Sequence, residues 1–424
     1  MIKRITSSIF ILLCCLTCAF GQPTVAKEYV CQIEKLSKNK AIKTALTHIT
    51  ELEPQTIKDL ILLTEIPAPP FEETERANKF KAMLEEAGAD KVGNVLALRK
   101  GSKGEKVVAL DAHIDTVFPR ETDVRVKYRG DTLVAPGIGD DTRGLAMILA
   151  VLKALNKAEI KTEENLLFVG TVGEEGLGDL RGVKHLFSEE TDIKIDSWIS
   201  IDGGKIGRVN HGALGSKRYR AHFKGKGGHS WGAFGLANPH HALGKAIEYF
   251  VNDALVYTNQ KGAKTSYSIG RIGGGTSVNS IPFESWFEVD MRSLDPNRLE
   301  EINTIFQKSV KRAVEDYNAS GVKDKVTLEL EMIGDRPSGI LSADLPLIQR
   351  AVAVTTHFGV KPRLTTGSTN GNIPISLGIP AITLGRGGKG GGAHSLDEWW
   401  LNQDGAKSIQ LTLLICVAEA GLNK

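Results

Sequence analysis

The stretch LLFVGTVGEE, residues 166–175, places an apolar run directly before two adjacent glutamates. A continuous apolar run of this length is typical of a strand that is buried on both faces, as in a parallel sheet. Similar runs occur at residues 107–110 and 198–201, and they alternate with helical patterns at residues 144–155 and 179–187. This alternation predicts an α/β fold with a mostly parallel sheet covered by helices.

Five imidazole or carboxylate side chains stand out in the chain, and most of them lie at or just beyond the end of a predicted strand. Imidazoles and carboxylates without thiolates suit zinc or a similar divalent ion, and a set so rich in oxygen suits two ions that share a carboxylate. Each residue alone has a commoner structural explanation, but ligands of parallel sheets bind beyond the carboxyl ends of the strands. The sequence therefore predicts a two-metal hydrolase whose ligands are His113, Asp140, Glu175, Asp202 and His394.

Three acids beside these ligands have predicted roles of their own. Asp115 follows His113 by two residues, so it can accept the second ring N–H of that histidine. Asp140 is predicted to bridge both ions, and its neighbour Asp141 to cap the following helix. Glu174 is the predicted general base, which takes a proton from water and passes it to the leaving amine. An exposed, decorative glutamate is the alternative, and the buried strand before Glu174 argues against it.

Composition limits the other classes of protein. A chain of 424 residues with 41% hydrophobic content is long enough for two domains. The net charge is only +3 and no long run of one charge occurs, so nothing indicates a nucleic-acid partner or a polybasic membrane surface. Cys31 and Cys416 are the two cysteines beyond the amino-terminal segment, and either a disulfide or two free thiols fits them. Beyond the amino-terminal segment no Cys-x-x-Cys pair occurs, which argues against zinc fingers and iron–sulfur sites.

The amino terminus has the pattern of an export signal. Lys3 and Arg4 precede an apolar run at residues 9–16, and small residues follow at the positions read by a signal peptidase. We expect residues 1–21 to be a cleaved secretory signal, which makes the mature protein secreted or periplasmic without a membrane anchor. Attachment of a lipid at Cys18 is the weaker alternative, because the residues before it make a poor lipobox.

The middle of the chain predicts a second domain. After a helix-prone leader at residues 22–50 and a first catalytic part at 51–212, residues 213–334 follow the order strand, helix, strand, strand, helix, strand. This order is typical of a split βαβ, or ferredoxin-like, α+β domain. It is inserted into the catalytic domain, whose second part is residues 335–424.

Three polar residues of the insert are candidates for the reaction. His229 lies in a glycine-rich turn and Asn279 follows a strand, and both could stabilise a tetrahedral oxyanion. Arg292 ends a strand and could hold a substrate carboxylate. For each of them, an ordinary turn or surface residue is an equally good explanation.

Eight blocks of the sequence together resemble a known family. In order, they are AHIDTV, PGIGDD, GEEGLG, IDGG, GKGGHS, GGGTSVNSIP, DMRS and GGAHSLDEW. They are similar to the co-catalytic zinc metallopeptidases that include peptidase T, glutamate carboxypeptidase, acetylornithine deacetylase and succinyl-diaminopimelate desuccinylase. The resemblance covers residues 55–420, both domains included.

The resemblance implies particular roles for these residues. One zinc would be held by His113, Asp140 and Asp202, and the other by Asp140, Glu175 and His394. The inserted segment resembles the dimerisation or lid domain of the family, in which the residue that matches His229 reaches the active site of the other subunit. Many members have a lysine shortly after the bridging aspartate, whereas this chain has Arg143 there, so the basic role stays open.

We therefore expect a secreted di-zinc metallopeptidase that forms a homodimer. A metal-bound hydroxide would attack the peptide bond of a small peptide, with Glu174 as base, and Co²⁺ or Mn²⁺ could replace zinc. Export favours peptide scavenging, so an aminopeptidase or dipeptidase is ahead of the alternative, an N-acyl amino acid deacylase. A non-catalytic binding protein on the same fold is disfavoured, because Glu174 and all five predicted ligands are present.

Overall fold

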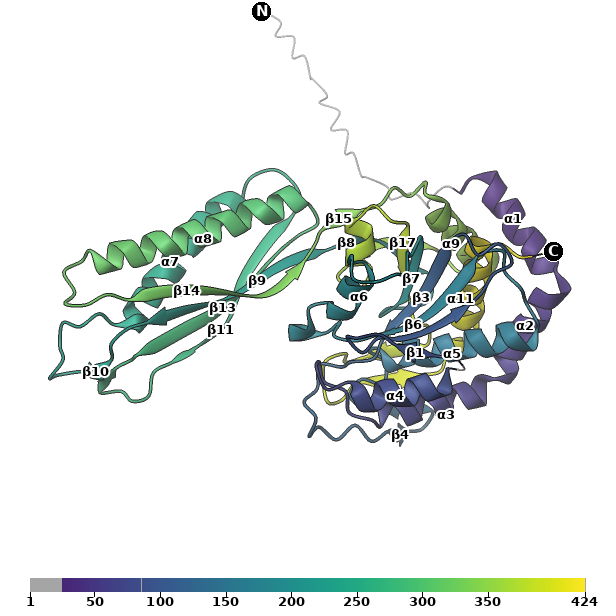
Figure 1. Ribbon diagram of the computed structural model, residues 1–424, viewed down its shortest axis with the longest axis horizontal. Coiled ribbons are helices and arrows are strands. Elements are labelled where there is room, and N and C mark those ends of the chain that lie inside the picture. The colour runs from purple at the N-terminus through teal and green to yellow at the C-terminus, as the bar shows by residue number, and fades with distance from the viewer. Residues whose placement is uncertain (1–24, 85, 424) are drawn as a thin grey trace, which may run out of the picture.

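The computed structural model describes residues 25–84 and 86–423. Strand β6 (Asn165–Thr171) lies inside a nine-stranded sheet, around which the larger of two lobes is built; we call this part the catalytic lobe. Strands β3 (Val107–His113), β7 (Ser197–Ile201) and β17 (Ala381–Leu384) continue from β6 in parallel. Antiparallel pairs occur towards both edges of the sheet, at β2 with β6 and at β17 with β8. The predicted mostly parallel sheet is confirmed (Figure 1).

The remaining strands of this sheet lie towards its two edges. They are β1 (Gly88–Ala89), β2 (Val95–Arg99), β8 (Arg208–Ala213), β15 (Gly339–Ile340) and β16 (Arg363–Gly367). The helices that accompany the sheet are α3 (Glu53–Thr64), α4 (Thr74–Met83), α5 (Thr142–Lys157), α6 (Arg181–Leu186), α9 (Pro346–His357), α10 (Asn372–Ser376) and α11 (Gly405–Ala420), with a 3₁₀ turn at Gly176–Gly178. Helix α11 was not among the predicted elements; it is apolar on most sides and almost wholly buried.

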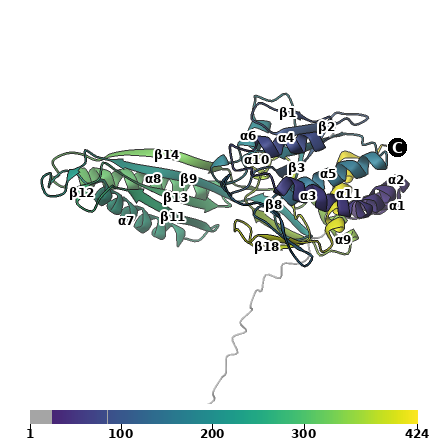
Figure 2. The same ribbon diagram turned by 90° about the horizontal axis from the view of Figure 1, so that it is seen from below.

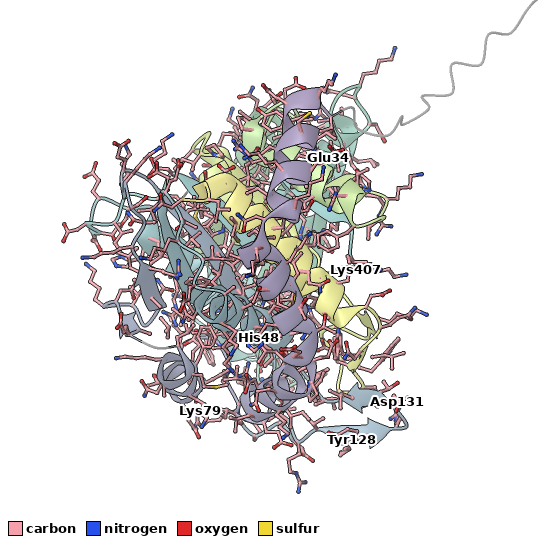
Figure 3. All side chains as sticks on the ribbon, turned by 90° about the vertical axis from the view of Figure 1, so that its right-hand side faces the viewer. Glu34, His48, Lys79, Tyr128, Asp131 and Lys407 are labelled. Atoms are coloured by element: carbon pink, nitrogen blue, oxygen red, sulfur yellow. The ribbon has the colours of Figure 1, made fainter. Side chains whose placement is uncertain are left out.

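The predicted leader forms two helices, α1 (Lys27–Lys38) and α2 (Lys40–Glu51). They follow one another across the outside of the catalytic lobe, where α1 packs on α9 and α11 and α2 on α5 and α11 (Figure 3). Cys31 and Cys416 are both free thiols. The predicted signal, residues 1–21, lies outside the described residues. Within the described residues, no helix is long and apolar enough to cross a membrane.

A small four-stranded sheet flanks the catalytic sheet. It consists of β4 (Lys127–Arg129), β5 (Thr132–Val134), β19 (Trp399–Leu401) and β18 (Lys389–Gly391). Its β5–β19 pairing brings two segments together that are far apart in the sequence, the glycine turn at residues 137–140 and the loop that carries His394. Sequence reasoning did not predict this sheet, because its strands have only three residues each.

The inserted lobe extends away from the catalytic lobe (Figures 1 and 2). Its elements follow the predicted order: β9 (Gly215–Lys224), α7 (Pro239–Thr258), β11 (Thr265–Gly274), β13 (Glu284–Ser293), α8 (Pro296–Asn318) and β14 (Thr327–Arg336). One face of the antiparallel sheet packs on α7 and α8 through a hydrophobic core separate from that of the catalytic lobe. A short pair, β10 (Gly228–His229) and β12 (Ser280–Ile281), forms the distant tip. The exact boundaries 213 and 334 stay a prediction.

Candidate active site

The structure brings the five predicted ligands together at the carboxyl ends of the parallel strands. His113 ends β3, and its Nε2 lies 3.4 Å from Oδ1 of Asp140. Nε2 of His394 lies 3.5 Å from Oδ2 of Asp140 and 3.0 Å from Oε1 of Glu175. Asp202 follows β7 directly. Two candidate metal-ligand groups result, each with its ligand atoms within 4.8 Å of one another, and both contain Asp140: His113, Asp140 and Glu175, and Asp140, Asp141 and Asp202.

Asp115 has a different contact from the predicted one. Nδ1 of His113 lies 3.0 Å from the main-chain oxygen of Asp115, which accepts the ring N–H and leaves Nε2 directed at Asp140. The Asp115 carboxylate is 3.7 Å from that nitrogen. It accepts instead from the main-chain N–H groups of Glu174 at 3.0 Å and Glu175 at 2.7 Å. Asp115 therefore fixes the main chain that carries both glutamates.

Asp141 provides the test of whether the residues fit a metal. It occupies the N-cap position of α5, but its side chain accepts no capping hydrogen bond, so the predicted capping role is wrong. Both carboxylate oxygens are buried without a hydrogen-bond partner, and burial raises the pKa of this group well above its usual value. Arg386 Nη1 is 3.8 Å from Oδ1 of Asp141, too far for a hydrogen bond. A buried carboxylate without hydrogen bonds is unfavourable, and a divalent cation between Asp141 and its neighbours Asp140 and Asp202 would satisfy it. The residues therefore fit a metal centre.

Glu174 is buried beside this cluster. Its Oε1 lies 3.0 Å from Nη1 of Arg336, and Nη2 of Arg336 donates to the main-chain oxygen of Glu174. Burial raises the pKa of Glu174 to about 8; the positive charge of Arg336 opposes this shift, and the negative charge of Glu175 adds to it. A carboxyl group in this range can both accept and release a proton near neutral pH. The environment suits the predicted base.

Glu398 is a residue that sequence reasoning missed. Its side chain is 1% exposed, and its carboxylate accepts from the main-chain N–H groups of Gly137 at 2.8 Å, Gly139 at 3.0 Å and Asp140 at 2.9 Å. Glu398 thus holds the turn that presents Asp140, and it follows His394 by four residues. Glu398 could have been predicted from its place within the block GGAHSLDEW, which also contains His394.

Arg386, not Arg143, is the cation beside Asp140. Arg143 is buried with its guanidinium 4.7 Å from the ring of Trp400, and it donates to the main-chain oxygen of Gly405. Nη1 of Arg386 lies 3.2 Å from Oδ1 of Asp140. Sequence reasoning missed Arg386 because it stands in a glycine-rich run without a motif of its own.

A cavity of about 410 Å³ opens over the cluster, which is a suitable size for a small substrate. One part of its wall consists of the acids and His394, and another consists of arginines from the inserted sheet. The arginines are Arg218, Arg292 and Arg336. Arg292 therefore lies in the cavity wall, where the predicted binding of a substrate carboxylate would take place.

His229 and Asn279 lie elsewhere. Both are exposed at the tip of the inserted lobe, where the main-chain N–H of Ser230 donates to the main-chain oxygen of Asn279 at 2.9 Å. Neither residue lines the cavity. Within one chain, the structure does not bring these two predicted residues to the site.

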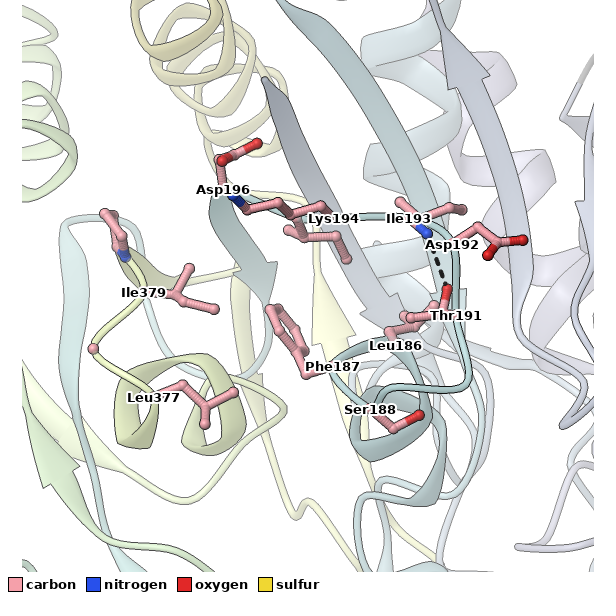
Figure 4. Close-up of a pocket in the computed structure, with 13 residues that line it drawn as sticks. Leu186, Phe187, Ser188, Thr191, Asp192, Ile193, Lys194, Asp196, Leu377 and Ile379 are labelled. Carbon is pink, nitrogen blue, oxygen red and sulfur yellow. Dashed lines mark hydrogen bonds between the residues drawn. The ribbon is translucent and has the colours of Figure 1, made fainter. Parts of the chain in front are cut away.

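A second cavity, of about 470 Å³, lies where strands β7 and β17 of the catalytic sheet begin, opposite the carboxyl ends that carry the candidate ligands (Figure 4). It is lined largely by apolar side chains such as Phe187, Leu377 and Ile379. It also contains Asp196 and Pro380, which come directly before β7 and β17, whereas Asp202 comes directly after β7. This cavity is therefore remote from the candidate ligands.

The parallel sheet and its cluster of carboxylates and imidazoles define a metal-dependent hydrolase. The chain belongs to peptidase family M20/M25/M40, which matches residues 109–416. It is 24% identical to acetylornithine deacetylase of Myxococcus xanthus over 372 residues, which cover 82% of this chain and 89% of the relative.

Two solved structures share the fold. The dipeptidase Dug1p of Saccharomyces cerevisiae superposes with a TM-score of 0.69 at 16% identity, covering 89% of this chain and 98% of Dug1p. The YXEP protein of Bacillus subtilis, described as a dinuclear metal-binding peptidase, gives a TM-score of 0.62 at 17% identity and covers 88% of this chain and 99% of YXEP. The family membership and the two ligand groups sharing Asp140 confirm the predicted class, an enzyme with a dinuclear metal site.

Proposed function

We propose that the protein is an exported di-zinc hydrolase that cleaves the peptide bond of a small peptide, as a dipeptidase or aminopeptidase. The observation that carries this proposal is the single cavity in which Glu174, four candidate ligands and three arginines meet. The sequence of residues 1–21 supports export to the periplasm or the medium.

The chain's own residues divide the work. Zinc held by the five predicted ligands would supply Lewis-acid activation of the amide carbonyl and of water. Glu174 accepts a proton from the attacking water and delivers it to the leaving amine nitrogen. The carboxylate of Asp115 keeps Glu174 in place by accepting from its main-chain N–H. Arg292 binds the carboxylate of the substrate.

A homodimer belongs to this proposal. His229 and Asn279 stand at the tip together with Trp231 and Phe234, whose side chains are 88% and 79% exposed. Clustered exposed aromatic residues are typical of a surface that binds another protein. In the proposed dimer, the tip of one chain covers the cavity of the other, so that His229 and Asn279 stabilise the oxyanion there.

An N-acyl amino acid deacylase is the second candidate, and one observation favours it. The acidic residues lining the cavity are Asp140, Glu175 and Asp202, which are candidate ligands, and Glu174. Among the described lining residues, no further carboxylate is available for the free ammonium group of a peptide. An acylated nitrogen needs no such partner.

Replacement of Glu174 by Gln tests the proposal. The variant should bind as much zinc as the wild type, measured by elemental analysis, and lose at least about 100-fold in kcat on every substrate that the wild type cleaves. The substrates are dipeptides and tripeptides with free and acetylated amino termini, assayed with zinc, cobalt or manganese. Glu121→Gln, at an exposed position, is the matched control. Full activity of Glu174→Gln would contradict the proposed mechanism, and the acetylated substrates decide between the two candidates.

A further inference from the structure

The three arginines of the cavity differ in how much of their hydrogen-bonding capacity is used. Arg336 is engaged by Glu174 and also donates to Ser368 Oγ at 3.2 Å. Arg218 and Arg292 each make one hydrogen bond to a carboxylate, through Nε only. A guanidinium has five N–H donors. Within the described part of the chain, the terminal Nη groups of Arg218 and Arg292 make no hydrogen bond to the protein.

One carboxylate holds both of these arginines. Nε of Arg218 donates to Oδ1 of Asp290 at 2.9 Å, and Nε of Arg292 donates to Oδ2 of Asp290 at 2.6 Å. The antiparallel sheet builds this arrangement, because Asp290 on β13 lies directly opposite Arg218 on β9, while Arg292 follows Asp290 by two residues on the same face. Two positive charges share one negative charge.

We propose that Arg218 and Arg292 form a paired anion site that selects substrates whose leaving amino acid carries two carboxylates, namely aspartate or glutamate. The α-carboxylate binds Arg292 and the side-chain carboxylate binds Arg218, each through the free Nη groups. This inference rests on the proposed function, because it assigns the substrate of the same cavity. Arg218 is the specificity-determining residue of the pair, because it accounts for the second carboxylate.

The proposal predicts a preference between two substrates that are nearly identical in shape. The wild type should cleave alanyl-glutamate, or acetyl-glutamate if the enzyme is a deacylase, with a kcat/KM about 10- to 100-fold above that for the glutamine analogue. Arg218→Gln should lower kcat/KM for the glutamate substrate to about the level of the glutamine substrate, mainly through KM. The loss should be smaller for the glutamine substrate, whose side chain carries no charge for Arg218 to bind. Arg218→Lys should restore part of the preference.

Arg220→Gln is the matched control. Arg220 is the next residue of β9 on the same face, but it pairs with Glu288 at 2.6 Å and lies outside the cavity lining. The control should keep the preference for glutamate. Equal rates for the glutamate and glutamine substrates in the wild type, or an unchanged preference in Arg218→Gln, would overturn the proposal.

A binding measurement separates this proposal from the proposed function. Calorimetry on zinc-loaded Glu174→Gln compares alanyl-glutamate with alanyl-glutamine, and the same comparison is made after adding Arg218→Gln. Tighter binding of the glutamate ligand that disappears with Arg218→Gln supports the anion site even if the wild type hydrolyses neither compound. Equal binding of both ligands overturns the anion site, whether or not hydrolysis occurs.

Discussion

The catalytic sheet and the inserted sheet deliver their side chains to the cavity by different rules. In the catalytic sheet, β3, β6 and β7 are parallel, so the residues that follow each strand meet at one edge. In the inserted sheet, β9 is antiparallel to both β13 and β14. The start of β9 therefore lies beside the ends of β13 and β14, where Arg218, Arg292 and Arg336 face the cavity.

The opposite end of the inserted sheet lies far from the cavity. The chain leaves β9 towards His229 and returns through Asn279 before β13, so both residues lie at the distant tip. A parallel sheet gathers its functional residues within one chain, whereas an antiparallel sheet divides them between two ends. In the proposed dimer, the tip of one chain serves the reaction in the other chain. The two ends of the inserted sheet can be tested separately.

The largest effect is expected at the tip. His229→Ala should lower kcat by roughly 10²- to 10³-fold, because it removes a donor to the oxyanion. Mixing this variant with Glu174→Gln under conditions of subunit exchange should restore roughly a quarter of wild-type activity, since half of the dimers are mixed and each has one intact site. Activity is measured before and after exchange. A lack of recovery would show that the tip does not act in the partner's site.

The near end of the inserted sheet should show a smaller effect on catalysis. Arg336 and Glu174 are both 6% exposed, so Arg336→Met leaves a buried carboxylate without its partner. We expect kcat to fall about 100-fold and the free energy of unfolding to fall by about 3 kcal/mol, measured by kinetics and by urea denaturation. Arg336→Lys, which keeps the charge, is the control and should retain more of both. An unchanged kcat in Arg336→Met would show that this end does not support the base.

The sequence predicted the catalytic sheet well for a physical reason. Apolar runs such as that before Glu174 mark strands buried on both faces, and the edge where parallel strands end then follows from chain direction alone. The position of His113, Glu175 and Asp202 could therefore be predicted without knowing the order of the strands. In the inserted sheet, the strands were predicted, but which ends face the cavity depends on the pairing of the strands and on the placement of the lobe.

Other parts of the site could not be predicted from local sequence patterns. Glu398 and Arg386 act on the turn at residues 137–140, which is more than 240 residues away in the sequence. The strands that bring these segments together have three residues each, too short for a pattern of alternation. The contact of Asp115 with two main-chain N–H groups likewise depends on the path of the turn after β6.

The smallest effect is expected at Glu398, which tests whether strand ends alone are sufficient to build the metal centre. Its two carboxylate oxygens accept hydrogen bonds from three main-chain N–H groups. The amide of glutamine offers only one oxygen, so its NH₂ group must face either the N–H of Gly137 or the N–H groups of Gly139 and Asp140. The turn should shift, and Glu398→Gln should weaken zinc binding about tenfold, measured by competition with a chelator.

The neighbouring variant Asp397→Asn is the matched control, because the Asp397 side chain is 85% exposed and makes its ion pair with Arg129 instead of the turn. It should bind zinc as the wild type does. Activity of Glu398→Gln should return at saturating zinc, because Glu398 lies behind Asp140 and does not line the cavity. If zinc affinity were unchanged, the carboxyl ends of the parallel strands would hold the metal ligands without help from the small sheet. The catalytic sheet would then position its functional residues by strand direction alone, and its difference from the inserted sheet would be greater than the structure suggests.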